Sequence, residues 1–391
     1  MDNCVIPHGY KATALGIIPQ EWEVMLLGNL SNSISSGRNK HRDAHGQYPV
    51  FGSTGIIGYS STYEYEGPVI LVARVGANAG TLNFASGQYD VSDNTLIITI
   101  KQNVYDYNFA YNQLTHYKLN KLVFGSGQPL ITSKQLKNIR IPVPPLAEQR
   151  KIAEVLGVWD EAIEKQARLI EKLALRKRAL MQRLLSAKLR LPGFSEPWKE
   201  HKIADLFSPI NDTNDGQEHI PMTISAKSGF ISQKDKFDRV IAGDSLQRYI
   251  LLKKGDFAYN KGNSNLYEMG CIYHLNEESA LVPFVYICFR SKGSVNIDFY
   301  SQFFINHGLD RQLKKIITSG ARGDGLLNVD KKDFFALNVP YPTIEEQTAI
   351  AEVLTAADHE IELAKEKLER LRRQKRGLMQ QLLTGKKRVK Y

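Results

Sequence analysis

The stretch Pro142-Val-Pro-Pro-Leu-Ala-Glu-Gln-Arg-Lys-Ile-Ala-Glu-Val-Leu156 decides the organisation of this chain, because it occurs twice. The second copy, Pro340-Tyr-Pro-Thr-Ile-Glu-Glu-Gln-Thr-Ala-Ile-Ala-Glu-Val-Leu354, lies 198 residues further on. When the alignment is extended to Arg190 and Arg388, 23 of 49 paired positions are identical. A spacing of about half the chain indicates duplication of one large module rather than a short solenoid repeat. A duplicated chain can mimic a two-fold dimer while its halves diverge, which suits a protein that reads two different things.

Each copy predicts a long helix that begins just after its prolines, because proline holds the preceding backbone extended. In the first copy the chain from Leu146 to about Leu189 contains no proline, and Leu191-Pro-Gly ends the helix. In the second copy Thr343 is the expected N-cap, with Glu346 three residues on as in a capping box. Gly385 stands near the expected end of that helix.

Both predicted helices carry an apolar seam whose gaps alternate between four and three residues, the spacing of a coiled coil. The apolar seam positions are Ile152, Leu156, Trp159, Ile163, Ile170, Leu173, Leu180 and Leu184 in the first copy, and Ile350, Leu354, Ile361, Leu368, Leu371, Leu378 and Leu382 in the second. At 1.5 Å per residue, roughly 40 residues make a rod of about 60 Å. Such a seam needs a partner, and the other copy is the obvious one.

The charge pattern favours antiparallel pairing of the two helices. Acidic residues concentrate in the first half of each helix and basic residues in the second half. Antiparallel alignment therefore sets acidic halves beside basic halves, and the pattern selects orientation although single surface pairs contribute little. Trp159 and Ala357 align in the repeat, which predicts a large side chain near a small one. The alternative is two unrelated helices on separate domains.

Composition excludes several classes of protein. The chain has 391 residues, 42% hydrophobic and 24% charged, which is ordinary for a globular protein with two or three domains. No apolar run reaches membrane-spanning length, and the N-terminal residues lack a signal-peptide pattern. Cys4, Cys271 and Cys288 are too few and too scattered for a disulfide framework, so we expect a cytoplasmic location.

The net charge of +10 lies mainly on the repeated helices, because residues 146–190 and 343–391 together carry eight of those charges. A basic excess favours a polyanionic partner, although a solvated helix face or a docking surface would give the same pattern.

Each helix follows a mixed, strand-rich region, in which β-branched runs are broken by Gly, Asn and Ser. We therefore expect an α+β fold with a pseudo-two-fold internal duplication. The expected division is 1–145 and 191–342 for the globular domains, and 146–190 and 343–391 for the helices, the last with a basic tail. The two domains align poorly outside a few landmarks, which suggests a duplicated scaffold with different loops.

The sequence contains only weak catalytic candidates. Asn338-Val-Pro-Tyr341 faintly echoes the Asn-Pro-Pro-Tyr motif of amino-methyltransferases, but it lacks the first proline and no cofactor glycine loop accompanies it. The loop Gly125-Ser-Gly-Gln lacks the third glycine of a dinucleotide fingerprint. The nine histidines show no metal spacing. We therefore predict a binding or scaffold protein that is not itself catalytic and binds no metal.

Together, these features resemble the specificity subunit of Type I restriction–modification systems. The resemblance rests on two variable domains, each followed by a Pro-x-Pro-x-x-x-Glu-Gln corner and a helix ending in Leu-Met-Gln-x-Leu-Leu, and it covers essentially the whole chain. The matching stretches are Pro142–Gln149, Leu180–Leu185, Pro340–Gln347 and Leu378–Leu383, together with Phe51–Tyr59 and Ser92–Thr95 in the first domain.

The resemblance implies a non-catalytic reader of double-stranded DNA. Each target recognition domain would read one half of a bipartite, asymmetric sequence, and the helices would be spacers that dock two methyltransferase subunits, to which restriction subunits can be added. This chain would bind no cofactor. S-adenosylmethionine for methylation, and ATP with Mg for restriction, would belong to the partner subunits.

Base reading requires Arg, Lys, Asn or Gln on exposed loops, and phosphate contacts require Lys, Arg or hydroxyl groups. The expected DNA-binding residues are Arg38, Lys40, Arg42, Arg74, Asn78, Ser126 and Gln128 in the first domain, and Lys227, Lys261, Asn263, Asn265 and Arg322 in the second. Two other functions stay open. A protein-binding scaffold would bind without sensitivity to salt or DNA sequence. A self-contained DNA-modifying enzyme would act with S-adenosylmethionine alone.

Overall fold

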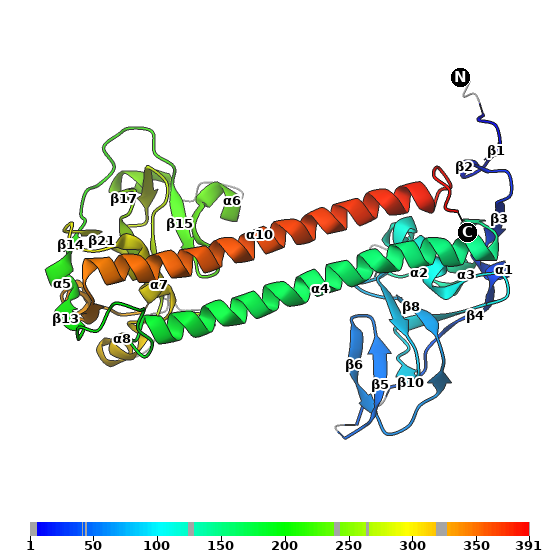
Figure 1. Cartoon of the computed structure of the whole chain (residues 1–391), viewed down its shortest axis with the longest axis horizontal. Coiled ribbons are helices and arrows are strands. Elements are labelled where there is room, and N and C mark those ends of the chain that lie inside the picture. The colour runs from blue at the N-terminus through cyan, green and yellow to red at the C-terminus, as the bar shows by residue number, and fades with distance from the viewer. Residues whose placement is uncertain are drawn as a thin grey trace. The chain divides into compact units, whose positions relative to one another are not determined.

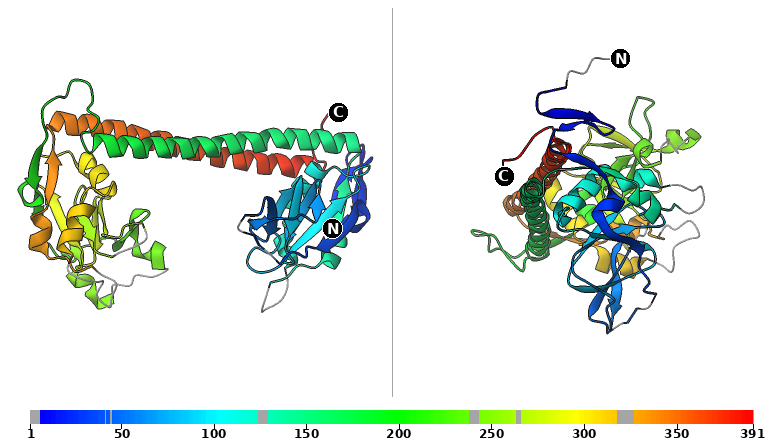
Figure 2. Two further views of the ribbon diagram at one scale, coloured as in Figure 1. Left: turned by 90° about the horizontal axis from the view of Figure 1, so that it is seen from below. Right: turned by 90° about the vertical axis from the view of Figure 1, so that its right-hand side faces the viewer.

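The computed structural model describes residues 6–40, 42–43, 45–123, 129–237, 243–262, 266–317 and 327–390. The chain forms two compact units (Figures 1 and 2). Unit 1 comprises Met1–Arg168 and Glu366–Tyr391, and unit 2 comprises Leu169–Lys365. The long helices α4 (Leu146–Leu184) and α10 (Ile344–Leu382) each contribute one part to each unit.

Unit 1 is built on an antiparallel sheet with the strand order β4-β11-β8-β9. A second four-stranded sheet has the order β6-β5-β10-β7, and two two-stranded pairs, β1-β2 and β12-β3, complete the strands. The strand bounds are β1 Tyr10–Thr13, β2 Gly16–Pro19, β3 Glu23–Leu26, β4 Ser31–Ser36, β5 Tyr48–Gly52, β6 Gly55–Ser60, β7 Tyr65–Glu66, β8 Val69–Ala73, β9 Leu82–Ala85, β10 Gln88–Val91, β11 Thr95–Ile100 and β12 Arg140–Val143. The helices besides α4 are α1 Leu27–Leu30, α2 Tyr107–Tyr117 and α3 Ser133–Lys137, with a 3₁₀ turn at Leu119–Leu122.

Strand β8 is a continuous apolar run because both of its faces are covered by other parts of unit 1. All five of its residues are buried. Successive side chains of a strand point to opposite faces, so Ile70 and Val72 pack with the helices while Val69 and Leu71 pack toward Tyr89. A strand buried on both faces shows no apolar–polar alternation.

Unit 2 repeats the central sheet, with the strand order β14-β21-β18-β19, also antiparallel. The pair β13-β22 is the counterpart of β12-β3 in unit 1, and unit 2 has the pairs β15-β16 and β17-β20 in place of the second sheet of unit 1. The strand bounds are β13 Lys199–Lys202, β14 Phe207–Pro209, β15 Met222–Ser225, β16 Gly229–Ser232, β17 Ile250–Lys253, β18 Phe257–Asn260, β19 Cys271–His274, β20 Ser279–Val282, β21 Ile287–Ser291 and β22 Asn338–Tyr341. The helices besides α10 are α5 Ile203–Leu206, α6 Gln233–Phe237, α7 Ile297–Ile305, α8 Asp310–Ile316 and α9 Lys331–Phe335, with a 3₁₀ turn at Gly243–Arg248.

Within each unit the two long helices run in opposite directions and meet through ion pairs. In unit 1 Asp160 of α4 pairs with Lys375 of α10. In unit 2 Lys177 of α4 pairs with Asp358 of α10, with an Nζ to Oδ1 distance of 2.6 Å. Every apolar seam position that the sequence predicts is buried or half-buried.

Two details of the helices differ from expectation. Helix α4 ends at Leu184, before the predicted Leu189, because Ala187 turns into the left-handed region at φ 56°. The Thr343 hydroxyl accepts from the Glu346 backbone N–H at 3.3 Å, but the Glu346 carboxylate bonds elsewhere, so the capping box is only half formed.

Candidate nucleic-acid interface

A polar surface forms in unit 1 around the turn Ser92–Asn94, which joins β10 to β11. The Val91 carbonyl accepts from the backbone N–H groups of Arg38 and Asn39, at 3.0 and 2.9 Å. On the other side, the Arg74 N–H donates to the Asn94 carbonyl at 2.9 Å. The turn therefore brings together two basic residues that are 36 positions apart in the sequence.

Gly37 makes this close approach possible. A Cβ at Gly37 would stand 2.3 Å from the Val91 carbonyl oxygen, so no other residue fits without moving the backbone. Beyond it, the Asn39 side chain donates to Asp90, and Arg42 Nη1 donates to Asn39 Oδ1 at 2.8 Å. Arg38, Asn39 and Arg42 are thus tied, directly or through one another, to the end of β10.

Three buried polar atoms at this turn have no hydrogen-bond partner among the residues that the structure describes. They are Arg74 Nε, Ser92 Oγ and Thr95 Oγ1. A buried polar group without a partner costs about 1–3 kcal/mol, so such groups need an explanation in a folded protein. Within the described ranges, this turn therefore holds buried polar atoms whose hydrogen-bonding capacity is not used.

The other predicted residues of the first domain lie around this turn or outside the described ranges. Arg38 is exposed, with its guanidinium 3.9 Å from Glu64, and Lys40 is exposed as well. Asn78 is exposed in the turn between β8 and β9. Ser126 and Gln128 fall outside the described residues, but the segment after them pairs with Val75 through Leu130, next to Arg74.

In unit 2 the structure brings two predicted residues toward each other. Lys227 is exposed in the turn between β15 and β16, and Lys261 directly follows β18. Asn260 Nδ2 donates to the Ile224 carbonyl at 3.3 Å, and Tyr273 Oη donates to the Ala226 carbonyl at 2.8 Å. These two bonds hold the turn that carries Lys227 against strands β18 and β19. Asn263, Asn265 and Arg322 lie outside the described residues.

The polar groups at the start of each long helix form a second site, for which sequence reasoning named the residues but not their contacts. Glu148 accepts from Trp22 Nε1 at 2.9 Å, and Glu346 accepts from Trp198 Nε1 at 2.9 Å. The neighbouring glutamine, Gln149, accepts from the backbone N–H of Asp106 at 2.8 Å. The sequence signal was partial, since Glu148 and Glu346 lie 198 residues apart like the repeated stretch, whereas Trp22 and Trp198 lie 176 residues apart.

Asn338–Tyr341, the catalytic candidate that lies within the described residues, is part of a sheet, and the loop Gly125–Gln128 lies outside the described residues. Asn338–Tyr341 is strand β22, paired with β13, and its Asn338 backbone is bonded in both directions by Gln312. Burial raises the pKa of the Cys271 thiol to about 11, which disfavours a nucleophilic thiolate. Within the described ranges no three His, Cys, Asp or Glu residues gather as metal ligands. Among the described helices, none combines the length and apolar character needed to cross a membrane.

Known proteins share both the sequence pattern and the fold. The sequence profile of the family "Type I restriction modification DNA specificity domain" matches residues 19–175 and again 234–373. The type I restriction enzyme MjaVIII specificity subunit of Methanocaldococcus jannaschii is 24% identical over 95% of this chain and 94% of its own length. The EcoprrI specificity subunit of Escherichia coli is 28% identical over 29% of this chain and 28% of its own length.

Solved structures give the same fold. The crystal structure of the Type I restriction–modification S subunit from M. genitalium superposes with a TM-score of 0.57 at 17% identity, covering 93% of this chain and 96% of that chain. A chain from a structure on complex assembly and conformational transition of the type I system gives 0.56 at 16% identity, covering 94% and 99%. The relatives that match nearly the whole chain are named as specificity subunits of type I restriction enzymes. The duplicated module and the twofold family match together place this chain in the Type I restriction–modification DNA specificity family.

Proposed function

We propose that this chain is the specificity subunit of a Type I restriction–modification system and reads a bipartite, asymmetric DNA sequence. The main support for this proposal is that both units contain the same central sheet but carry different polar surfaces. The strand order of the central sheet is the same in both units, whereas the Ser92 turn of unit 1 and the Lys227 turn of unit 2 share neither sequence nor bonding. Two different readers on one framework suit two different half-sites.

The proposed division of the chain follows the expected boundaries. Residues 1–145 and 191–342 are the two target recognition domains, and residues 146–190 and 343–391 are the spacer helices. The spacers form one antiparallel coiled coil, supported by the Asp160–Lys375 and Lys177–Asp358 pairs and by the buried seam. Half-sites read from one face of a duplex lie near one helical turn apart, about 34–36 Å, a separation that a rod of about 60 Å can set.

The proposed DNA contacts centre on the Ser92 turn in the first domain. Arg74 is half-buried beside this turn, with its backbone N–H bonded to the Asn94 carbonyl at 2.9 Å, and its guanidinium is the proposed base reader. Arg38, Lys40 and Arg42 lie on the adjoining loop, where they can neutralise phosphates. In the second domain Lys261 directly follows β18 as Arg74 follows β8, and Lys227 is exposed on the β15–β16 turn that is held against β18 and β19.

The partners of the proposed subunit are double-stranded DNA, two methyltransferase subunits and, where present, restriction subunits, in the cytoplasm. The exposed faces of α4 and α10 are the proposed docking surfaces for the methyltransferase subunits. Methyl transfer with S-adenosylmethionine, including flipping of the target base, belongs to those partners, as does ATP with Mg for restriction. This chain supplies sequence selection and geometry.

Methylome sequencing of cells with and without the intact chain tests the proposal. We expect one bipartite motif to lose methylation when the chain is absent. Binding of the purified complex to that motif should weaken with salt, with a log–log slope of about 0.9 per neutralised phosphate. An unchanged methylome would reject DNA specificity, and salt-independent binding of a protein ligand would favour the scaffold function. Methylation by the purified chain alone would favour a self-contained enzyme.

Alanine substitutions separate base readers from phosphate contacts. Arg74→Ala should cost roughly 1–3 kcal/mol on the matched site and relax one position of the motif, whereas Lys40→Ala should weaken binding to all sequences. Lys11→Ala, on β1, is a control of equal charge change away from the Ser92 turn. If the complete set of predicted residues can be replaced without effect, the contact surface lies elsewhere.

A domain exchange separates reading from spacing. Exchanging residues 15–140 for the matching segment of a relative should change one half of the motif only. Inserting about one heptad between Arg168 and Arg176 should alter the tolerated gap or abolish assembly, with base preferences unchanged. An exchange that altered both half-sites would refute the division of labour.

A further inference from the structure

The start of α4 is held by a residue from the end of the other repeat. Glu148 is completely buried and takes a two-pronged contact from the Arg388 guanidinium, with Nε to Oε1 at 2.5 Å and Nη2 to Oε2 at 2.9 Å. Trp22 donates to the same carboxylate at 2.9 Å. Arg388 also reaches Glu21 at 2.9 Å. Paired carboxylate and guanidinium forks of this kind are directional and strong.

Unit 2 contains the same constellation with the repeats exchanged. Glu346, at the start of α10, is 1% exposed and takes Arg190 Nε and Nη2 at 2.6 and 2.8 Å. Trp198 donates to it at 2.9 Å, and the Arg190 guanidinium stands over the Trp198 ring at 5.7 Å. Both constellations therefore consist of a buried glutamate, a tryptophan and an arginine.

The connection between repeats is crosswise. Glu148 begins α4, but its arginine follows α10. Glu346 begins α10, but its arginine follows α4. The positions correspond across the repeat, since Arg190 and Arg388 differ by the same 198 residues as the two glutamates. The buried glutamate beside each globular domain is thus bound by an arginine that follows the long helix of the other copy.

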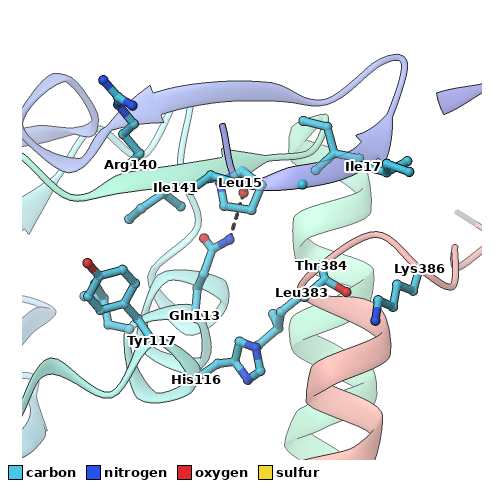
Figure 3. Close-up of a pocket in the computed structure, with 14 residues that line it drawn as sticks. Leu15, Ile17, Gln113, His116, Tyr117, Arg140, Ile141, Leu383, Thr384 and Lys386 are labelled. Carbon is cyan, nitrogen blue, oxygen red and sulfur yellow. Dashed lines mark hydrogen bonds between the residues drawn. The ribbon is translucent and has the colours of Figure 1, made fainter. Parts of the chain in front are cut away.

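The C-terminal tail packs on the first domain over a wider area than one ion pair. Leu383 is buried in the core of unit 1. The Gly385 carbonyl accepts from Tyr10 Oη at 3.1 Å, and a Cβ at Gly385 would stand 2.3 Å from Pro19 Cδ. Figure 3 shows Leu383, Thr384 and Lys386 forming one wall of a hollow of about 380 Å³, whose other walls come from β2, α2 and β12.

We propose that Arg388 and Arg190 are positioning residues for target recognition, each holding the recognition domain of the other repeat on its helix. The C-terminal tail therefore governs reading of the half-site that belongs to the N-terminal domain, and the segment after α4 governs the other. This inference rests on the proposed DNA-reading function, but its structural arm is tested without DNA.

The burial of the glutamates is the physical reason for a strong effect. An exposed ion pair contributes little, because water replaces the lost partner. Glu148 and Glu346 have almost no contact with water, so removal of the arginine leaves a buried carboxylate short of its counter-charge, which is strongly destabilising. The tryptophan N–H alone cannot neutralise that charge.

Amide hydrogen exchange of the intact chain tests the crosswise arrangement. In Arg388→Ala, protection around residues 10–26 and at the start of α4 should fall about ten- to a hundredfold, with unit 2 unchanged. Arg190→Ala should give the converse pattern. Arg372→Ala, which breaks an exposed pair with Glu369, is the matched control and should change neither unit. Equal loss in both units, loss in the wrong unit, or no loss overturns the proposal.

Three further variants keep the test decisive if Arg388→Ala fails to fold. Arg388→Lys keeps the charge but not the fork, and should give the same pattern at smaller amplitude. Glu148→Gln keeps an acceptor for Trp22, and should couple with Arg388→Lys in a double-mutant cycle. Glu346→Gln should be additive with Arg388→Lys. Coupling to Glu346, or additivity with Glu148, would contradict the crosswise assignment.

The functional arm uses the chain assembled with its methyltransferase subunits. In Arg388→Lys, mapped methylation should tolerate changes in the half-site of the first domain or in the gap, while the other half-site stays strict. Arg190→Lys should relax the other half. If amide hydrogen exchange follows the crosswise pattern but the assembled complex shows no DNA specificity, the proposed function fails and the crosswise contact stands. If specificity exists and both half-sites relax equally, the positioning role fails.

Discussion

In unit 1 the sheet β4-β11-β8-β9 packs aliphatic side chains such as Ile70 and Ile98 toward its helices. In unit 2 the equivalent sheet β14-β21-β18-β19 packs aromatic rings, with Phe257 stacked on Phe289 at 5.3 Å between ring centroids. The strand order and the direction of every pair in these sheets are nevertheless the same. A strand order therefore tolerates different side chains, provided that each fills the space between sheet and helices.

The helix corners show the opposite behaviour. Both use a Glu-Gln pair after a proline, a tryptophan that donates to the glutamate, and an arginine from the other copy. Hydrogen bonds have fixed partners and narrow geometry, whereas apolar packing needs only volume. This difference explains why the corners kept their residues while the cores changed theirs.

Truncation of a core side chain should give the largest loss of stability, and it compares the two cores directly. Phe289→Ala should cost about 3–5 kcal/mol, and Ile98→Ala at the matching place of unit 1 about 2–5 kcal/mol. Urea titration followed by hydrogen exchange should show each variant weakening its own unit first. Phe289→Leu, which retains most of the volume, is the control. Simultaneous weakening of both units would mean that the two cores are not independent.

A smaller effect is expected at the corners. Gln149 bonds three backbone groups, at Asp106, Val104 and Pro144, whereas Gln347 bonds two. Replacement by alanine leaves buried backbone groups without partners, which should cost about 2 kcal/mol at Gln347 and more at Gln149. Thermal unfolding of both variants measures the difference. An equal or reversed order would show that the third bond of Gln149 contributes nothing.

The ion pairs along the helices should matter less. Lys177→Met and Lys375→Met each remove a pair whose aspartate is partly exposed, so each should cost less than about 1 kcal/mol. Raising the salt concentration should shrink the difference from the unsubstituted chain. A large, salt-independent loss would identify packing of the lysine stem as the main contribution.

The mildest expected effect is a pH dependence shared by both units. Burial lowers the pKa of His116 in unit 1, helped by Lys118 and Lys121, and burial lowers the pKa of His274 in unit 2. The unfolded chain therefore binds these protons more readily, and stability should fall as pH drops below about 6.5. Unfolding midpoints between pH 7.5 and 5.5 measure the loss. His116→Phe should reduce it in unit 1 only, and an unchanged slope would exclude His116 as a contributor.

Much of this organisation was determined by the sequence itself. Prolines followed by uninterrupted heptads predict a long helix, because proline excludes helix before it and seam spacing depends only on helical geometry. Helices α4 and α10 accordingly begin within a residue of the predicted places. The charge halves predicted antiparallel pairing, and opposite charges do meet within each unit, at Asp160 with Lys375 and at Asp358 with Lys177. Repeated motifs also predicted the family, since they occur twice and in order.

Tertiary structure alone decided which distant groups meet. The sequence gives no distance between Arg388 and Glu148, which lie 240 positions apart, or between Arg74 and Asn94. These contacts depend on how strands β8, β10 and β11 turn and on where the tail after α10 packs. Helices α2 and α7 were not predicted either, because their short apolar patterns resemble buried strands until a sheet covers them. Local patterns specify elements, whereas buried polar contacts exist only once the fold removes water from both partners.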